Sequence, residues 1–307
     1  MTPAPKTAPL APARLEEVAE NVYAYVQPDG SWCLNNAGVI SVDGESTLVD
    51  TTATEQRARA LREAVLGVGV APRVVVNTHS HGDHTFGNFV FPEAVVVGHA
   101  GTRAEIQKVG LHLTGLWPDV CWGEIELSPP TITYEDRLTL HIGSVRADVV
   151  DMGTAHTAND TVVWLPEQRV LFTGDLVMRG VTPFIPMGSL SGALAAVRAM
   201  RELRPEVIVP GHGPVCGTEA LDETERYLQW VRGLAQEGLA AGATPLEVAH
   251  DTDFGPWAEL LDPERLVPNL HRAYAELRGA APGSPVDMTA LFQEMVTFRG
   301  TPPVCHA

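Results

Sequence analysis

The sequence feature that most constrains the fold is a predicted buried strand followed directly by a cluster of histidines. Residues 73–78 read Arg-Val-Val-Val-Asn-Thr, and His79-Ser80-His81-Gly82-Asp83-His84 follows without a spacer. A short run rich in valine is typical of a strand buried in a sheet. The polar segment is therefore expected in a tight loop at the end of that strand.

Short β-type runs separated by turn residues fill most of the first 215 positions. Asp43-Gly44 between two apolar runs predicts an antiparallel hairpin, and residues 53–66 have the apolar spacing of a helix. Further strands are expected over 22–26, 94–98, 131–134, 138–142, 145–151, 161–165, 169–173 and 207–209. Further helices are expected over 190–203, 217–240, 244–250, 263–278 and 287–298.

This pattern predicts an α/β domain followed by a helical extension. We expect the α/β catalytic domain over residues 21–215 and helices packed on it over residues 216–307. Residues 1–20 are predicted to be a flexible arm rich in proline and alanine, and four of the first thirteen residues are prolines. Those prolines interrupt the apolar segment that a secretory signal requires.

The charge balance argues against polyanionic partners. The 307 residues include 21 basic and 38 acidic side chains, which gives a net charge of −17. Nucleic acids and anionic membrane surfaces both bind clustered cations, so neither is expected as a partner. We expect a small-molecule substrate, and the sequence leaves open whether the chain forms a homo-oligomer.

The cysteines and the hydropathy favour a cytoplasmic protein. The four cysteines are widely spaced and form no C-x-x-C pair, which argues against a cysteine zinc site and fits a reducing compartment. No stretch approaches the length of uninterrupted apolar sequence that a spanning helix needs. Cytoplasmic localisation is the resulting prediction.

The histidine cluster has the spacing of a metal-binding loop. On a tight loop, residues two apart project in the same direction, so His79 and His81 can bind one ion. Asp83 and His84 lie further round the turn and can face a neighbouring ion. Imidazole and carboxylate groups are suitable ligands for Zn²⁺. A polar loop that merely caps a helix is the weaker interpretation, because protonated histidines this close would repel one another.

Further candidate ligands occur where other strands are expected to end. His156 lies between two predicted strands, Asp175 follows Phe172-Thr173-Gly174, and His212 lies within Pro210-Gly211-His212-Gly213. Taken alone, each of these residues is more often an ordinary polar or turn residue. Asp50 ends an earlier strand, Leu48-Val49.

These five segments, in this order, resemble the metallo-β-lactamase-fold metallohydrolase superfamily, whose members include the H-x-H-x-D-H zinc hydrolases. The resemblance extends from about residue 22 to residue 215. It implies an α/β fold of the four-layer αββα sandwich type. It also implies a metal-dependent hydrolase.

The resemblance further implies two zinc ions per chain. The implied ligands are His79, His81 and His156 for the first ion, Asp83, His84 and His212 for the second, and Asp175 for both. Asp83, His84 and Asp175 are the implied catalytic residues. Asp50 is expected to orient the ligands by hydrogen bonds without contacting metal.

Several differences between this sequence and known subfamilies narrow the expected activity. Iron-dependent relatives carry Glu at the position of His81, so His81 favours zinc. Glutathione thiolester hydrolases usually have Gly-Gly after the loop and a basic patch, whereas Thr85-Phe86-Gly87-Asn88 follows here and lysine occurs only at positions 6 and 108. The expected substrate is a small, largely apolar ester, lactone, thioester, amide or haloaromatic compound.

Two other functions compete with hydrolysis. The first is a mononuclear iron oxidoreductase of the same fold, similar to a persulfide dioxygenase, which would leave His84 and His212 without a metal. The second is a ligand-binding protein without activity, which would be expected to lack one of the motif residues, and none is missing here.

Aromatic and methionine residues near the motifs are the candidates for a substrate pocket. These residues are Trp32, Trp117, Trp122, Met178, Phe184 and Met187. The equally weighted alternative is that the tryptophans seal the C-terminal helices onto the domain. Six histidines without a motif are expected to be structural or exposed, namely His99, His112, His141, His250, His271 and His306.

Overall fold

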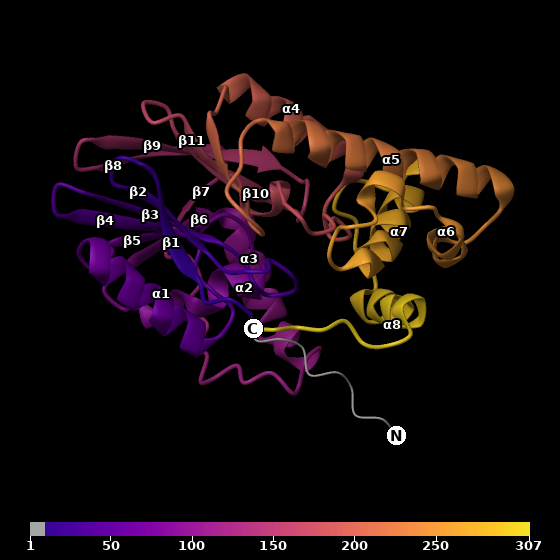
Figure 1. Ribbon diagram of the computed structural model, residues 1–307, viewed down its shortest axis with the longest axis horizontal. Helices are drawn as coiled ribbons and strands as arrows, with labels where there is room; N and C mark the ends of the chain where they lie inside the picture. The colour runs from indigo at the N-terminus through magenta and orange to yellow at the C-terminus, as the bar shows by residue number, and fades with distance from the viewer. Residues whose placement is uncertain (1–9) are drawn as a thin grey trace.

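Two β-sheets stack face to face at the centre of the fold (Figure 1). The structure, a computed structural model, describes residues 10–307. The first sheet contains, in spatial order, β1 (Arg14–Ala19), β2 (Val22–Val26), β3 (Ala37–Val42), β4 (Glu45–Val49), β5 (Val74–Asn77), β6 (Val95–His99) and β7 (Ile132–Tyr134). The second contains β12 (Val207–Val209), β11 (Val170–Phe172), β10 (Asp160–Leu165), β9 (Val145–Gly153) and β8 (Arg137–Ile142).

The first sheet changes from antiparallel to parallel at β4. Strands β1 to β4 pair antiparallel, and β4, β5, β6 and β7 pair parallel. The predicted hairpin joins β3 to β4, with Val42 paired to Glu45. Both loop residues have positive φ, 54° at Asp43 and 78° at Gly44, as a two-residue type I′ turn requires.

The faces between the two sheets form one apolar core. Valine, isoleucine and phenylalanine side chains dominate it, as expected for strands covered on both faces. Representative members from the two sheets are Ile40, Val49, Val76, Val149, Val163 and Phe172.

Helices cover the outer face of each sheet. On the first sheet, α1 (Glu55–Val68) buries Ala58, Leu61 and Val65 against strand residues such as Leu48. On the second sheet, α4 (Leu190–Leu203) buries an apolar stripe in a core that also contains β10 and β11 residues. The layers are therefore helix, sheet, sheet and helix, and the predicted αββα sandwich is confirmed.

The remaining helices are short or belong to the C-terminal part. Near the site lie α2 (Gly82–Thr85), α3 (Ala100–Val109) and the 3₁₀ turns η1 (Phe86–Val90), η2 (His112–Gly115) and η3 (Gly174–Leu176). The C-terminal part contains α5 (Glu219–Ala241), α6 (Pro245–Asp251), η4 (Gly255–Trp257), η5 (Pro263–Arg265), α7 (Leu266–Leu277) and α8 (Met288–Arg299).

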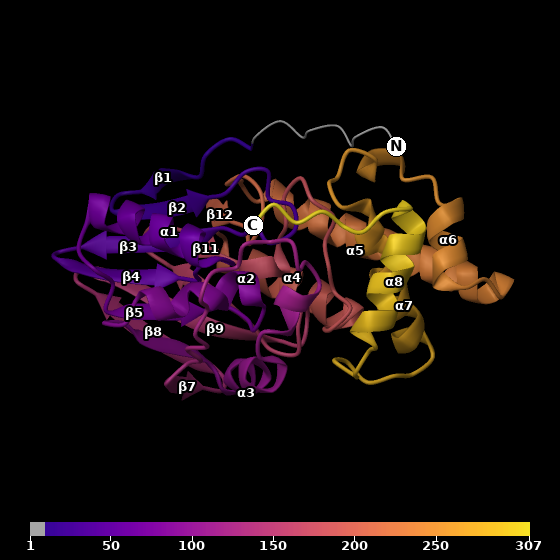
Figure 2. The same cartoon turned by 90° about the horizontal axis from the view of Figure 1, so that it is seen from below.

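The C-terminal helices gather at one end of the sandwich. Figure 2 shows α6, α7 and α8 beside one another, away from the β3–β4 end of the sheets. After α8 the chain returns to the first layer, where the Arg57 guanidinium donates a hydrogen bond to the His306 carbonyl at 2.6 Å. The helical extension therefore contacts both outer layers of the sandwich.

The prediction of a flexible arm over residues 1–20 is wrong for residues 14–19. Residues 14–19 form β1, which pairs with β2 from Arg14 opposite Val26 to Ala19 opposite Val22. Leu15 packs on the apolar cluster beneath α1, and this contact anchors the strand. Residues 1–9 lie outside the described residues, so the prediction for them remains a prediction.

None of the helices within residues 10–307 combines the length and the apolarity that crossing a membrane requires.

Candidate metal centre

The histidine loop lies where the sequence places it, at the carboxyl end of β5. After Asn77 the chain turns through His79 and His81 and enters the short helix α2, which carries Asp83 and His84. The Thr85 hydroxyl donates a hydrogen bond to the His81 carbonyl at 2.9 Å, which closes the turn. His79, Asp83 and His84 are buried, and His81 is half-buried.

Three other strand ends bring their residues to the same place. His156 follows β9, Asp175 lies in η3 after β11, and His212 follows β12. Close approach of the last two segments requires glycine, because a Cβ on Gly211 would lie 1.9 Å from Asp175 Oδ1. All seven residues that the sequence singled out as metal ligands therefore meet in one centre.

Four of them form the first group: His79, His81, His156 and Asp175. Their candidate ligand atoms all lie within 4.8 Å of one another. His156 Nε2 lies 2.9 Å from His81 Nδ1 and 3.3 Å from Asp175 Oδ2. His79 Nε2 lies 3.8 Å from the same oxygen.

The second group contains Asp83, His84 and His212. His212 Nε2 lies 3.3 Å from Asp83 Oδ2, and His84 Nε2 lies 4.0 Å from that oxygen. Ligands about 2.1 Å from a tetrahedral zinc ion lie about 3.4 Å apart, so both groups have suitable spacing.

Asp175 lies between the two groups. Its Oδ1 is 3.0 Å from His84 Nε2, and its Oδ2 is 3.5 Å from His212 Nε2, in addition to its contacts with the first group. The Asp175 carboxylate therefore contacts imidazoles of both groups. A carboxylate placed in this way can bind two cations at once.

The histidines are oriented by hydrogen bonds on their outer nitrogens. Nδ1 of His84 lies 2.8 Å from Asp50 Oδ2, and Nδ1 of His212 lies 2.8 Å from the Gly30 carbonyl. His156 Nδ1 contacts the Phe184 carbonyl in the same manner. Donation from Nδ1 leaves the Nε2 lone pair directed into the centre, as in most histidine metal sites.

The Asp50 carboxylate makes its hydrogen bonds on the outer side of the histidine cluster. Its carboxylate accepts hydrogen bonds from the Thr78 amide at 2.8 Å and the Thr78 hydroxyl at 2.7 Å, besides its contact with His84. Asp50 also lies within ligand distance of His79 and His84. Because both of its oxygens already have partners, Asp50 is a positioning residue rather than a further ligand.

The donor set fits divalent metal ions. Nε2 of His79 and His84 and Oδ1 of Asp175 are buried at the centre and make no hydrogen bond of suitable geometry. Buried polar atoms without partners are rare in native proteins and usually indicate a missing partner such as an ion. Imidazole and carboxylate ligands in groups of three or four suit zinc.

The electrostatics of the centre also favour bound cations. Burial alone would raise the pKa of Asp83, but His84 and His212 outweigh it and lower that pKa to about 2. Burial would lower the pKa of His212, but Asp175 and Asp83 raise it to about 9. The carboxylates thus stabilise positive charge in their neighbourhood. A bound divalent cation would supply that charge. Burial lowers the pKa of His156 to about 3, so this residue is neutral, as a metal ligand must be.

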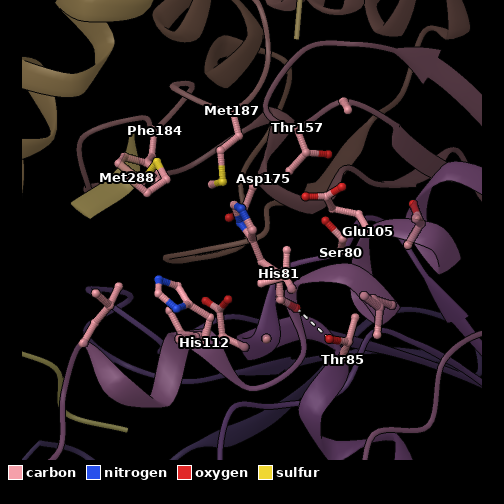
Figure 3. Close-up of a pocket in the computed structure, with 18 of the residues that line it drawn as sticks. Ser80, His81, Thr85, Glu105, His112, Thr157, Asp175, Phe184, Met187 and Met288 are labelled. Atoms are coloured by element: carbon pink, nitrogen blue, oxygen red, sulfur yellow. Dashed lines mark hydrogen bonds between the residues drawn. The ribbon is translucent and has the colours of Figure 1, made fainter. Parts of the chain in front are cut away.

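A cavity of about 330 Å³ opens onto the centre (Figure 3). His81, Asp83, Asp175 and His212 form part of its lining. Figure 3 shows Phe184, Met187 and Met288 gathered on one side, and Thr157, Glu105 and Ser80 on another. A substrate in this cavity would lie directly against the ligand residues.

Five of the six pocket residues expected from the sequence line this cavity: Trp32, Trp117, Met178, Phe184 and Met187. Trp122 is not part of the lining, because its ring packs against Phe86, with centroids 6.3 Å apart, and its Nε1 donates a hydrogen bond to the Trp117 carbonyl. Trp117 also contacts Phe292 of α8, so it both lines the cavity and seals a C-terminal helix.

Sequence reasoning missed several lining residues. His112, expected to be structural or exposed, lines the cavity from η2, and Arg265, Met288, Phe292 and Met295 line it from the C-terminal part. No local motif marks these residues. By contrast, His99 caps α3 by accepting a hydrogen bond from the Gly101 amide at 3.0 Å, which is a structural role.

Comparison with known proteins agrees with this architecture. A family model described as the metallo-beta-lactamase superfamily matches residues 30–212. The chain is 21% identical to the metallo-beta-lactamase type 2 of Bacteroides fragilis over 224 residues, which cover 70% of this chain and 84% of that protein. It is 25% identical to the human (Homo sapiens) acyl-coenzyme A thioesterase MBLAC2 over 178 residues, 52% of this chain and 63% of the relative.

The name of a third relative describes an enzyme that acts on an aromatic ether. The alpha subunit of 2,4-dinitroanisole O-demethylase from Nocardioides sp. (strain JS1661) is 26% identical over 181 residues, 58% of this chain and 50% of that subunit. Among solved structures, the metallo-beta-lactamase from Pontibacter korlensis superposes with a TM-score of 0.59 at 22% identity, covering 71% of this chain and 99% of that chain. DIM-1 metallo-beta-lactamase gives 0.58 at 20% identity, with 72% and 99% covered. These similarities show the fold.

Proposed function

Because the chain belongs to the metallo-beta-lactamase superfamily, we propose that it is a hydrolase that uses two zinc ions. The position of Asp175 carries the proposal. Its two carboxylate oxygens contact histidines of both groups, so one residue connects two three-ligand sites. Asp175 would be the fourth protein ligand of each ion, so water or substrate would occupy a fifth coordination position, as catalytic zinc sites allow.

Bound zinc would supply a Lewis acid and would lower the pKa of water toward 7. The chain's own residues would then control the geometry. Asp50 and the Gly30 carbonyl fix the His84 and His212 rings, and Asp175 keeps the two groups together. Asp83 faces the cavity, and its lowered pKa keeps it ionised as a ligand rather than available as a proton donor.

We propose a small, largely apolar electrophile as the substrate, namely an ester or lactone, a thioester, an amide or a haloaromatic compound. The apolar residues that line the cavity support this class. The names of the relatives support it as well, because they include a thioesterase and an enzyme acting on a nitroaromatic ether. No nucleic acid or membrane partner is proposed. All four cysteines are free thiols, which supports the proposed cytoplasmic location.

Metal analysis combined with a substrate screen tests this function. Purified protein loaded with zinc is assayed against lactone, thioester, β-lactam and haloaromatic substrates. We expect about two zinc ions per chain and turnover of at least one substrate, which is lost in Asp175→Ala. One iron per chain with oxygen consumption would instead establish the mononuclear oxidoreductase. Zinc-loaded protein that hydrolyses none of the four classes would also overturn the proposal.

A further inference from the structure

One side of the cavity is formed by residues outside the region that the family model matches. The matched region ends at residue 212, and the solved structures cover about 72% of this chain. Met288, Phe292 and Met295 of α8 and Arg265 of η5 line the cavity from beyond that limit. The C-terminal part therefore shapes the space in front of the metal centre in a way that the shared fold does not determine.

Four aromatic rings form a continuous row along this side of the cavity. Phe184 and Trp32 have centroids 5.1 Å apart at an interplanar angle of 76°, and Trp32 and Trp117 are 5.4 Å apart at 49°. Trp117 and Phe292 follow at 5.7 Å and 84°. Such tilted and edge-to-face contacts are favourable arrangements of aromatic rings. The row joins the catalytic domain to α8.

Thioether groups complete this side. The lining includes Met178, Met187, Met288 and Met295, which are four of the seven methionines in the sequence. Methionine is polarizable and makes favourable contacts with the edges of aromatic rings. The four aromatic and four methionine side chains together are called the aromatic–thioether wall below.

Residues of the C-terminal part hold the wall in place. Trp32 Nε1 donates a hydrogen bond to Glu264 Oε1 at 2.9 Å, and the Arg265 guanidinium lies 4.0 Å from the centre of the Trp32 ring. Trp117 Nε1 donates to the Pro303 carbonyl at 2.7 Å. Both indole N–H groups are therefore already used, and they fix the ring planes instead of binding a ligand.

The charges around the cavity favour an uncharged ligand group at the wall. Arg265 is 2% exposed and pairs with Asp262 at 2.9 Å. Lys108 pairs with Glu105 at 3.2 Å. Asp262 thus balances the charge of Arg265, and the Lys108 side chain is 73% exposed beside Glu105, so neither adds an unbalanced positive charge at the wall.

We propose that the aromatic–thioether wall selects substrates that carry a planar, uncharged aromatic group next to the bond that is cleaved. This inference rests on the proposed hydrolase function and deepens it. A cavity of about 330 Å³ suits a small molecule rather than a polymer. Met187, Met288 and Phe292 are the half-buried members of the wall, and a flat ring can pack against them more closely than a puckered aliphatic ring, which gives the selectivity.

A fluorescence binding experiment tests the wall without requiring turnover. N-phenyl-1-naphthylamine, an uncharged aromatic probe whose emission rises in apolar surroundings, is titrated into the zinc-loaded protein. Phe292→Ala removes a half-buried ring from the wall and should weaken probe binding by about tenfold. Displacement by 2-naphthamide should be several-fold more effective than displacement by its fully saturated decahydro analogue.

Phe298→Ala is the matched control. Phe298 lies on the same helix and is half-buried, but it packs against His250 and Phe254 away from the cavity. Its replacement should leave probe binding unchanged while causing a comparable loss of helix packing. Equal weakening by both variants, or equal displacement by the flat and the saturated amide, would overturn the assignment. Probe binding as expected, without hydrolysis of any of the four substrate classes, would instead refute the proposed function and leave the wall in place.

Discussion

At the residue scale, the metal centre depends on hydrogen bonds that face away from it. Asp50, the Gly30 carbonyl and the Phe184 carbonyl each contact the outer nitrogen of one histidine. These contacts select the tautomer in which Nε2 is free for metal. The inner nitrogens of His79 and His84 make no hydrogen bond, as expected of imidazoles whose lone pairs serve as metal ligands.

Asp175→Ala should lose most metal from the second site and nearly all hydrolytic activity, while the chain still folds. The substitution removes the carboxylate that contacts both groups of histidines. Metal analysis should show a fall from about two zinc ions per chain to about one, with an unchanged circular dichroism spectrum. Asp222→Ala, which removes an exposed carboxylate paired with Arg201, is the control and should retain both ions. Unchanged turnover in Asp175→Ala would refute its bridging role.

Asp50→Asn should weaken zinc binding without removing a ligand. The amide keeps the size of the side chain, but its NH2 group only donates, so it cannot accept all three hydrogen bonds that Thr78 and His84 direct to the carboxylate. Loss of such an orienting group typically costs about 10–100-fold in metal affinity. Competition with a chelator measures this change. Wild-type affinity in this variant would mean that Asp50 does not position the ligands.

The ligand residues were predictable because their chemistry is local in sequence. His79, His81, Asp83 and His84 fall within six positions, and each distant partner follows a strand of readable pattern. The wall residues Met288 and Phe292 were not predictable, because a half-buried methionine or phenylalanine on a helix has the same local pattern whether it packs on the core or lines a cavity.

At the element scale, apolar periodicity identified most helices and strands. The helix expected over 190–203 matches α4, and the hairpin at Asp43-Gly44 is confirmed. The edge strand β1 was missed because its sequence, Arg-Leu-Glu-Glu-Val-Ala, is polar and follows a proline-rich stretch. Its conformation comes from pairing with β2, which is a tertiary interaction.

Two truncations at the N-terminus should distinguish the contribution of β1 to stability from that of the residues before it. Deleting residues 1–13 leaves all of β1 and should keep activity and melting temperature unchanged. Deleting residues 1–20 removes the strand, exposes the edge of β2 and takes away the packing of Leu15, so the melting temperature should fall by several degrees. Differential scanning calorimetry compares the two. Equal melting temperatures would mean that β1 adds no stability.

At the scale of the whole molecule, the centre joins the two halves of the sandwich. The loop after β5 belongs to the first sheet, whereas His156, Asp175 and His212 follow strands of the second. Ions bound there would crosslink both sheets.

Zinc should therefore stabilise the entire fold. At a free zinc concentration 100 times the dissociation constant, binding to the native state alone adds about 2.7 kcal/mol to the free energy of unfolding. Protein stripped with a chelator should melt several degrees lower and should recover on addition of zinc but not of magnesium, which prefers oxygen ligands. Identical melting curves with and without zinc would argue against a metal centre between the sheets.

The central claim is that the seven converging ligands bind a pair of metal ions bridged by Asp175. Anomalous diffraction at the zinc edge, from crystals of the zinc-loaded protein, measures this directly. We expect two peaks about 3.5–4 Å apart, one beside His79, His81 and His156 and the other beside Asp83, His84 and His212. One peak alone, or peaks away from Asp175, would contradict the account.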